Sequence, residues 1–197
     1  MPAPDALADS ESNARRVLLC LDIQAGVLSA PPKGVPSANT LRQNLAAVLA
    51  AARGASQPPL IIHVRNAGDF GDVDEPSSTG WQLVHTPLQN EPVVDKRKNN
   101  AFASTKLGDL IPLDAEIVIV GLQSDFSVRA TCSAALGRGN EVLLIHGAHG
   151  TYDRLEVLYG GGITPAAQIE EEIEGELQEA GVHLLEMKDL SAIFDDR

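Results

Sequence analysis

The chain has few cysteines. Of its 197 residues only two, Cys20 and Cys132, carry a thiol, which is too few for a disulfide framework. Both lie in apolar segments, and this setting is typical of buried thiols in a reducing compartment. A disulfide-stabilised secreted fold is therefore excluded, and we expect a cytoplasmic protein.

Positive charge and long apolar runs are also scarce. The 15 basic residues stand against 27 acidic ones, and the net charge of -12 argues against a binder of nucleic acid or anionic membranes. No segment approaches the roughly 18 apolar residues of a membrane span. The first residues, MPAPDALADSESNARR, lack the apolar run of a signal peptide. We therefore expect a small-molecule substrate as the partner, with no nucleic acid and no membrane.

Apolar runs of strand length alternate with helical segments along the chain. Because most of these runs are continuously apolar, they favour a parallel sheet that is covered on both faces. The pattern predicts a single Rossmann-like α/β domain at 15–197, with a doubly wound six-stranded parallel sheet and helices on both faces, after a flexible segment at 1–14. The six expected strands are RVLLCLD (16–22), PLIIHVR (59–65), PVVD (92–95), AEIVIVG (115–121), EVLLIHG (141–147) and VHLLEM (182–187).

Two segments between these strands have helical periodicity. The first is expected to begin at Ser37, whose side chain would cap it, and to end at Gly54. The second is expected to open at Thr164 and Pro165 and to end at Gly181. Its acidic run EEEIEGE is interpreted as a solvated face.

One long connection, residues 66–91, is polar and contains the only tryptophan, Trp81. Loops of this length in compact domains are often lids or binding loops. Trp81 is a candidate wall of the substrate pocket, and a loop anchor packed on the core is an equally good interpretation.

Polar side chains follow the first predicted strand. Asp22 comes directly after RVLLCL, so its carboxylate would lie at the edge of the sheet where α/β proteins bind ligands, among apolar neighbours that raise its pKa. It is a candidate general acid or base, although an Asp at a strand end can equally cap a turn. Gln24, two residues later, could orient a substrate.

A second group of residues follows the fourth predicted strand. In GLQSDFSVRATCSAAL (121–136) a helix is expected to begin near Ser124 or Asp125, so Ser127 falls in its first turn. Backbone N–H groups there could hold an oxyanion. Cys132 lies about 140° further round the helix and is interpreted as core. Taken alone, Ser127 is more simply a hydroxyl that satisfies a backbone donor.

The third group is DKRKNNAFASTKLGDL (95–110), in which Lys96 follows a short strand. Together with LLCLDIQAGVL (18–28) and GLQSDFSVRATCSAAL, this segment resembles the three motifs of the isochorismatase-like hydrolase superfamily, also called the cysteine hydrolases. The resemblance covers about residues 15–153. It implies a hydrolase with Asp22 as the catalytic aspartate and Lys96 as the catalytic lysine, with Lys98 as a less well aligned alternative.

The resemblance carries further expectations. Ser127 occupies the position of the nucleophile, and the bond between Leu122 and Gln123 would be a cis peptide that shapes an oxyanion hole. Leu122, Gln123 and Phe126 are expected to bind substrate. Dimers or tetramers are common in the family, so a homo-oligomer is expected. His149, Tyr152 and Asp153, in GAHGTYD, resemble a pocket-bordering loop of some relatives.

Ser127 departs from the family pattern, because most members have cysteine at this position. A hydroxyl must lose its proton during the attack to a well-placed base. Three interpretations stay open: cleavage of an isochorismate-type vinyl ether, with Asp22 as the general acid and no nucleophile; hydrolysis of an amide, carbamoyl or ureide C–N bond, with serine in place of cysteine natively or by mutation; or a non-catalytic descendant that binds a small molecule.

The metal-binding pattern of the nicotinamidase branch is also missing. That branch has an Asp, any residue and His after its second strand, whereas this chain has HVRNAGDFGD (63–72). His63 would be buried in the strand, and His85 is interpreted as a surface residue. We therefore expect no metal and no cofactor.

Overall fold

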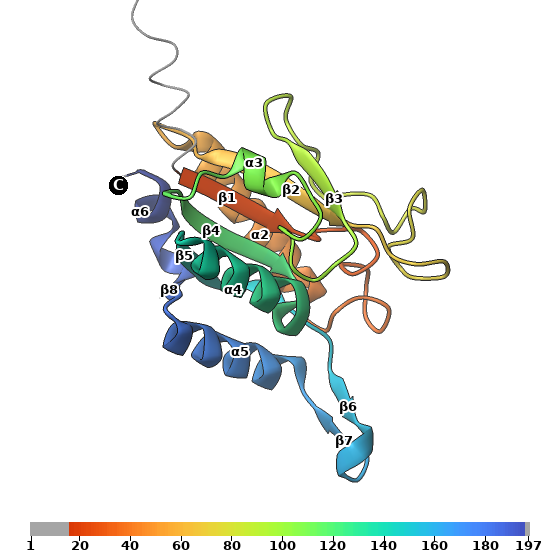
Figure 1. Cartoon of the computed structure of the whole chain (residues 1–197). Coiled ribbons are helices and arrows are strands. Elements are labelled where there is room, and N and C mark those ends of the chain that lie inside the picture. The colour runs from red at the N-terminus through yellow and green to blue at the C-terminus, as the bar shows by residue number, and fades with distance from the viewer. Residues whose placement is uncertain (1–15, 196–197) are drawn as a thin grey trace, which may run out of the picture.

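The computed structural model describes residues 16–195, and the predicted flexible segment 1–14 lies outside them. Six parallel strands form the main sheet in the order β3-β2-β1-β4-β5-β8 (Figure 1). The predicted α/β class and parallel sheet are confirmed. The strands are β1 (Arg16–Leu21), β2 (Leu60–Asn66), β3 (Val93–Lys96), β4 (Glu116–Leu122), β5 (Glu141–Gly150) and β8 (His183–Leu185).

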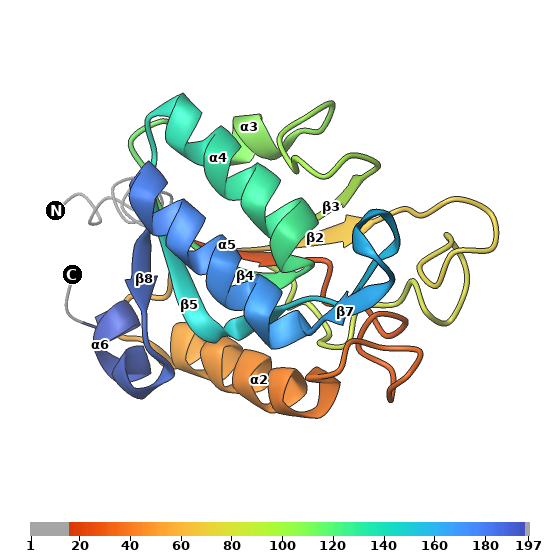
Figure 2. The same ribbon diagram turned by 90° about the horizontal axis from the view of Figure 1, so that it is seen from below.

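Helices cover both faces of this sheet, as its continuously apolar strands require (Figure 2). Along β1, Leu18 and Cys20 pack into the core on the side of α2 and α6, whereas Leu19 and Leu21 pack into the core on the side of α3, α4 and α5. Cys20 and Cys132 are both buried free thiols. The helices are α2 (Ala38–Gly54), α3 (Leu107–Leu110), α4 (Arg129–Arg138), α5 (Ala166–Ala180) and α6 (Leu190–Asp195).

The predicted cap of α2 is wrong in its chemistry. Ser37 does precede the helix, but with φ of -85° and ψ of 9° its side chain makes no capping hydrogen bond, and its buried Oγ has no partner among residues 16–195. The helix is held instead by its apolar stripe, of which Leu41, Leu45 and Val48 are fully buried. It ends at Gly54, as predicted.

The predicted solvated face of α5 needs one correction. Glu174 is 7% exposed, and its Oε1 lies 2.8 Å from His146 Nδ1 and 2.9 Å from His149 Nε2. The N-terminus of the helix is capped from outside, where Ala166 N–H donates to Asp153 Oδ1 at 2.8 Å. Gly181, in the left-handed conformation, ends the helix as predicted.

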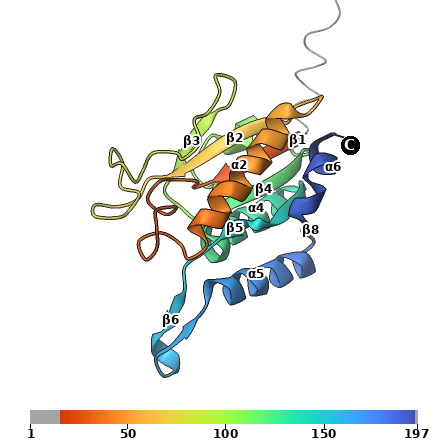
Figure 3. The same ribbon diagram turned by 180° about the vertical axis from the view of Figure 1, so that it is seen from behind.

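A two-stranded antiparallel hairpin, β6 (Arg154–Glu156) and β7 (Gly162–Thr164), was not predicted. It projects from the body beyond the N-terminal end of α5 (Figures 1 and 3). Its exposed apolar side chains include Leu155, Leu158 and Ile163. Within residues 16–195, none of the helices combines the length and the apolar character that crossing a bilayer requires.

A buried ion pair ties the long loop to α2 and β2. Glu91 accepts hydrogen bonds from Arg53 Nε (2.8 Å) and Nη2 (2.7 Å), from Leu88 N–H (2.9 Å), and from His63 Nε2 (2.9 Å) when that nitrogen carries a proton. Burial alone would raise the pKa of Glu91, but these partners outweigh it and lower the pKa from 4.5 to about 2.

We expect Glu91→Gln to lower the free energy of unfolding by about 1–3 kcal/mol at pH 7. The lower figure allows for solvent screening near Arg53, which is 28% exposed. A lowered pKa stabilises the fold above pH 4.5, and this contribution is lost as the pH falls toward 2. Urea denaturation should therefore show a smaller difference at pH 3 than at pH 7. The exposed Glu179→Gln is the control, and an equal loss at both pH values would contradict the prediction.

Candidate active site

The site lies between the carboxyl ends of β1 and β4, where the order of the sheet reverses: β2 and β3 lie on one side of β1, and β4, β5 and β8 lie on the other. Strands β1 and β4 approach closely there. A side chain at Gly121, which has φ +122°, would place its Cβ 1.9 Å from Leu21 O. Glycine is thus required where β4 delivers the next residues to the site.

Asp22 follows β1 with a left-handed φ of 52°, and its N–H donates to Val64 O at 2.9 Å. The side chain is buried, and Oδ2 lies 2.8 Å from Lys96 Nζ. Within the described residues Oδ1 accepts no hydrogen bond. Burial raises the pKa of Asp22 above its usual 3.8, against the opposing effect of the Lys96 ammonium. The carboxyl group is therefore a better proton acceptor than an ordinary aspartate.

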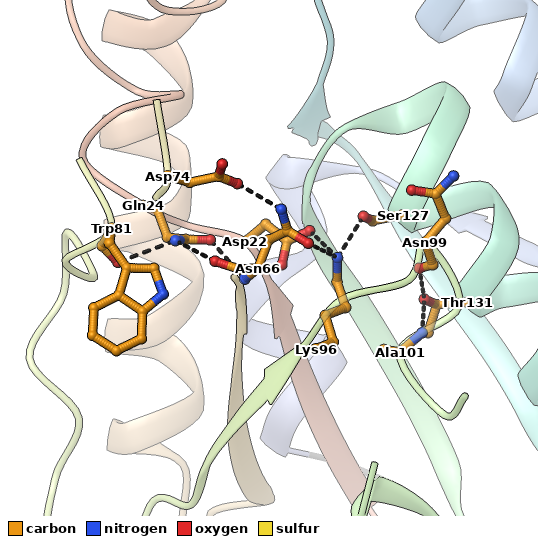
Figure 4. Close-up of polar contacts among 10 residues, drawn as sticks. All are labelled: Asp22, Gln24, Asn66, Asp74, Trp81, Lys96, Asn99, Ala101, Ser127 and Thr131. Carbon is orange, nitrogen blue, oxygen red and sulfur yellow. Dashed lines mark hydrogen bonds and ion pairs between the residues drawn. The ribbon is translucent and has the colours of Figure 1, made fainter. Parts of the chain in front are cut away.

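Lys96 ends β3 and is 2% exposed, unlike most lysines. Besides its ion pair with Asp22, Nζ donates to Ser127 Oγ at 3.0 Å and to Asn66 Oδ1 at 3.1 Å (Figure 4). Lys98, the alternative in the motif, is exposed and lines a different hollow from the one that Asp22 and Ser127 line. The geometry thus brings Lys96, and not Lys98, to Asp22.

Ser127 lies in the first turn of the helix that follows β4, as predicted, but that turn is π-helical. The turn η1 (Ser124–Val128) precedes α4, and Val128 N–H donates to Gln123 O at 3.1 Å. The peptide bond between Leu122 and Gln123 is cis, as the resemblance implied. Ser127 is 5% exposed and reaches Lys96 from the opposite side of the site to Asn66 (Figure 4).

Asn66 is a central residue of the site that the sequence analysis missed. Its Oδ1 accepts from Lys96 Nζ, and its Nδ2 donates to Asp74 Oδ2 at 2.7 Å. It ends β2 at the same sheet edge as Asp22 and Lys96. The rule that ligands bind beyond the carboxyl ends of parallel strands could therefore have indicated it.

A cavity of about 250 Å³ opens over these residues. Two of the three predicted catalytic residues, Asp22 and Ser127, line it, whereas Lys96 does not; three of the expected substrate contacts also line it. Asn66, Asp74 and Asn99 line it without having been predicted. The full lining is Asp22, Val27, Asn66, Asp74, Asn99, Leu122, Gln123, Phe126 and Ser127.

Gln24 and Trp81 do not line this cavity. The Gln24 amide is fully buried and bonded to backbone: Nε2 donates to Asn66 O (3.0 Å) and Trp81 O (3.1 Å), and Oε1 accepts from Asn66 N–H (2.8 Å). The Trp81 ring lies against the guanidinium of Arg65, 3.4 Å from its Cζ. Both residues anchor the long loop to β2, which favours the anchor interpretation of Trp81.

The three residues of the GAHGTYD segment are also engaged elsewhere. His149 is buried between Ser124 Oγ and Glu174, each 2.9 Å away. Tyr152 and Asp153 line a different hollow, where the Tyr152 hydroxyl donates to Lys33 O. None of the three lines the cavity beside Ser127.

The two histidines weighed as metal ligands lie apart from the site. His63 is buried in β2 and contacts Glu91. His85, predicted to be a surface residue, is only half-buried, and among residues 16–195 its Nε2 has no hydrogen-bond partner. Among residues 16–195, no three His, Cys, Asp or Glu side chains are grouped to hold a metal ion. The absence of a metal stays a prediction.

Comparison with known proteins identifies the family. The model of the isochorismatase domain matches residues 16–159. Two curated relatives from Streptomyces noursei, both named streptothricin hydrolase, are 40% identical over 159 residues and 39% identical over 145 residues. These matches cover 78% and 70% of the chain but 60% and 50% of the relatives, so the chain spans only part of their length.

A solved structure shares the fold over nearly its full length. The isochorismatase of Pseudomonas putida KT2440 is 29% identical and superposes with a TM-score of 0.78, covering 89% of this chain and 90% of its own. The domain match, the relatives and this superposition agree with the three motifs gathered at the cavity. The chain belongs to the isochorismatase family of hydrolases.

Proposed function

We propose that the protein hydrolyses C–N bonds of small amide-type compounds through an acyl-enzyme intermediate on Ser127. The observation that carries the proposal is the shared hydrogen-bond donor Lys96, whose Nζ lies 2.8 Å from Asp22 Oδ2 and 3.0 Å from Ser127 Oγ. A nucleophile and a carboxylate base are thereby held at one cavity. The two relatives named streptothricin hydrolase support hydrolysis over other chemistry.

In the first half-reaction, Ser127 Oγ attacks the substrate carbonyl carbon while its proton passes to the unpartnered Oδ1 of Asp22. The carbonyl electron pair moves to oxygen, which backbone N–H groups at the start of the η1 turn stabilise. Lys96 donates to Oγ and offsets the negative charge that develops on it. The C–N bond then breaks as Asp22 returns the proton to the departing nitrogen.

In the second half-reaction, water replaces the released amine. Asp22 takes a proton from that water, whose oxygen attacks the acyl carbon. The bond from this carbon to Ser127 Oγ breaks, and Oγ recovers the proton. The products are a carboxylic acid and an amine or ammonia, and no metal or cofactor enters any step. Because burial raises the pKa of Asp22, its carboxylate accepts protons more readily than an ordinary aspartate does.

Cleavage of a vinyl ether is the second candidate, and the same raised pKa of Asp22 favours it, because a protonated carboxyl can serve as the general acid. This route needs no nucleophile at position 127. The cavity nevertheless suits it less well: its charged lining residues are the carboxylates Asp22 and Asp74, which disfavour an anionic substrate such as isochorismate.

The variant Ser127→Cys separates these functions. A thiol beside Lys96 and at a helix start ionises more easily than a hydroxyl, so we expect kcat on small primary amides or ureides to rise about 10-fold or more. The rate of ammonia release measures this kcat. Unchanged amide turnover together with hydrolysis of isochorismate would favour the ether route. No turnover by either form, with a ligand that still raises Tm, would favour a binding protein.

Alkylation with iodoacetamide provides an independent readout of the same variant. Burial raises the pKa of both natural thiols, Cys20 and Cys132, to about 12, so the parent protein should react slowly. Ser127→Cys should gain one rapidly labelled site, located by mass spectrometry of the peptide that contains it. A new thiol no more reactive than the buried ones would contradict the proposed activation by Lys96.

A further inference from the structure

Two negative charges and no positive one face the cavity. Its charged lining residues are Asp22 and Asp74, and no Lys or Arg is among the described residues that line it. Lys96 neutralises Asp22 from beneath, at 2.8 Å. Asp74 forms no ion pair within residues 16–195, so the cavity retains its negative charge.

Asp74 is held in place. It is 8% exposed, and its Oδ2 accepts from Asn66 Nδ2 at 2.7 Å (Figure 4). Its Oδ1 accepts no hydrogen bond from the described residues. A Cβ at position 68 would lie 2.2 Å from Asp74 Oδ1, so glycine at this position leaves room for the oxygen. The hydrogen bond from Asn66 and the space left by Gly68 therefore position this carboxylate at the cavity.

A carboxylate so deeply buried normally has a cationic partner, because loss of hydration without compensation is costly. Here the carboxylate has one amide hydrogen bond, from Asn66, and the residue lines the cavity. We propose that Asp74 is a specificity-determining residue that binds a cationic group, an ammonium or guanidinium, of the substrate. This inference rests on the proposed function and names its substrate class: small amide-type compounds that carry a positive charge.

The geometry links the cation to the reacting carbonyl. Asn66 bridges Asp74 and Lys96, so the carboxylate and Ser127 are connected through two side chains and lie at the same cavity. The apolar side chains Val27, Leu122 and Phe126 also line it and can contact a short alkyl chain between the two groups. A cavity of about 250 Å³ is below the roughly 300–1,000 Å³ of drug-sized ligand sites, which suits a small substrate.

The test compares amides that differ only in charge. The probes are 4-aminobutanamide, 5-aminopentanamide and 6-aminohexanamide, each paired with the neutral amide in which a methyl group replaces the ammonium: pentanamide, hexanamide and heptanamide. We expect kcat/KM for at least one amino amide to exceed that of its neutral partner by about 10- to 100-fold, as expected for a hydrogen bond to a charged group. Ammonia release, measured by a coupled assay, gives the rates.

The variant Asp74→Asn should abolish this preference. It keeps an oxygen that can accept the hydrogen bond from Asn66 and removes the charge, so the ratio of kcat/KM for each amino amide to that for its neutral partner should fall to about one. Asp69→Asn is the matched control, since Asp69 lies in the same loop, carries the same charge and is 95% exposed at its side chain. The control should retain the full preference for amino amides.

Binding of n-butylammonium, measured by calorimetry against the same concentration of potassium chloride, tests the cation site without turnover. We expect the affinity to fall about 10-fold or more in Asp74→Asn and to be unchanged in Asp69→Asn. Equal binding by Asp74→Asn and the parent, or equal turnover of charged and neutral amides, would overturn the proposal while leaving C–N hydrolysis intact. Loss of butylammonium affinity in a protein that hydrolyses none of the amides would support the cation site and overturn the proposed function.

Discussion

The variant Asp22→Asn is expected to lose amide hydrolysis by about 10²- to 10⁴-fold in kcat/KM, the range that general acid–base catalysis contributes. The amide keeps the shape of the side chain, and its oxygen can still accept from Lys96 Nζ. It cannot take the Ser127 proton or return one to the leaving nitrogen. Both proposed half-reactions depend on these transfers, so KM should change much less than kcat.

The pH profile gives a second measure of the same residue. The proposed base acts as the carboxylate, so the rate should fall as the pH drops through the pKa of Asp22. Burial raises this pKa above 3.8, so activity should be lost at higher pH than for an ordinary aspartate. The exposed Asp109→Asn is the control and should keep both the rate and the profile. An Asp22→Asn variant with kcat within about threefold of the parent would remove Asp22 from the mechanism.

The main sheet could be predicted because its strands are uninterrupted apolar runs. Val17, Leu19 and Leu21 pack on one face while Leu18 and Cys20 pack on the other, and only a sheet covered on both faces buries both sets. The hairpin at 154–164 lacked such a signal. Its strands have three residues each, and its apolar side chains face solvent, so neither strand length nor alternation distinguished it from a loop.

The site was predictable in part, because its catalytic candidates lie at the ends of these apolar strands. Asp22, Lys96 and Ser127 each lie at or after the end of a strand within a recognisable motif, and the structure brings Asp22 and Ser127 within hydrogen-bond distance of the Lys96 ammonium. Asp74 lies in the long loop, where the path of the chain is set by contacts with Asn66 and Gly68 that no local pattern encodes. Glu174 was misread because a glutamate in an acidic run indicates solvent unless its histidine partners are known.

Ser127→Ala is the other substitution with a large expected effect. It removes the proposed nucleophile while Lys96 keeps its contacts with Asp22 at 2.8 Å and Asn66 at 3.1 Å, so the site should stay folded. We expect amide turnover to fall by on the order of 10³-fold or more, since no other hydroxyl or thiol lines the cavity among the described residues. If the protein instead cleaves a vinyl ether with Asp22 alone, Ser127→Ala should leave the rate of isochorismate hydrolysis nearly unchanged.

The most direct test of the account is therefore the ammonia-release rate of Ser127→Ala on the primary amide that the parent protein hydrolyses fastest, with Ser127→Cys assayed in parallel. The account predicts a loss of on the order of 10³-fold or more in the alanine variant and activity at or above the parent level in the cysteine variant. An alanine variant that keeps its rate within about tenfold of the parent would contradict a covalent role for Ser127.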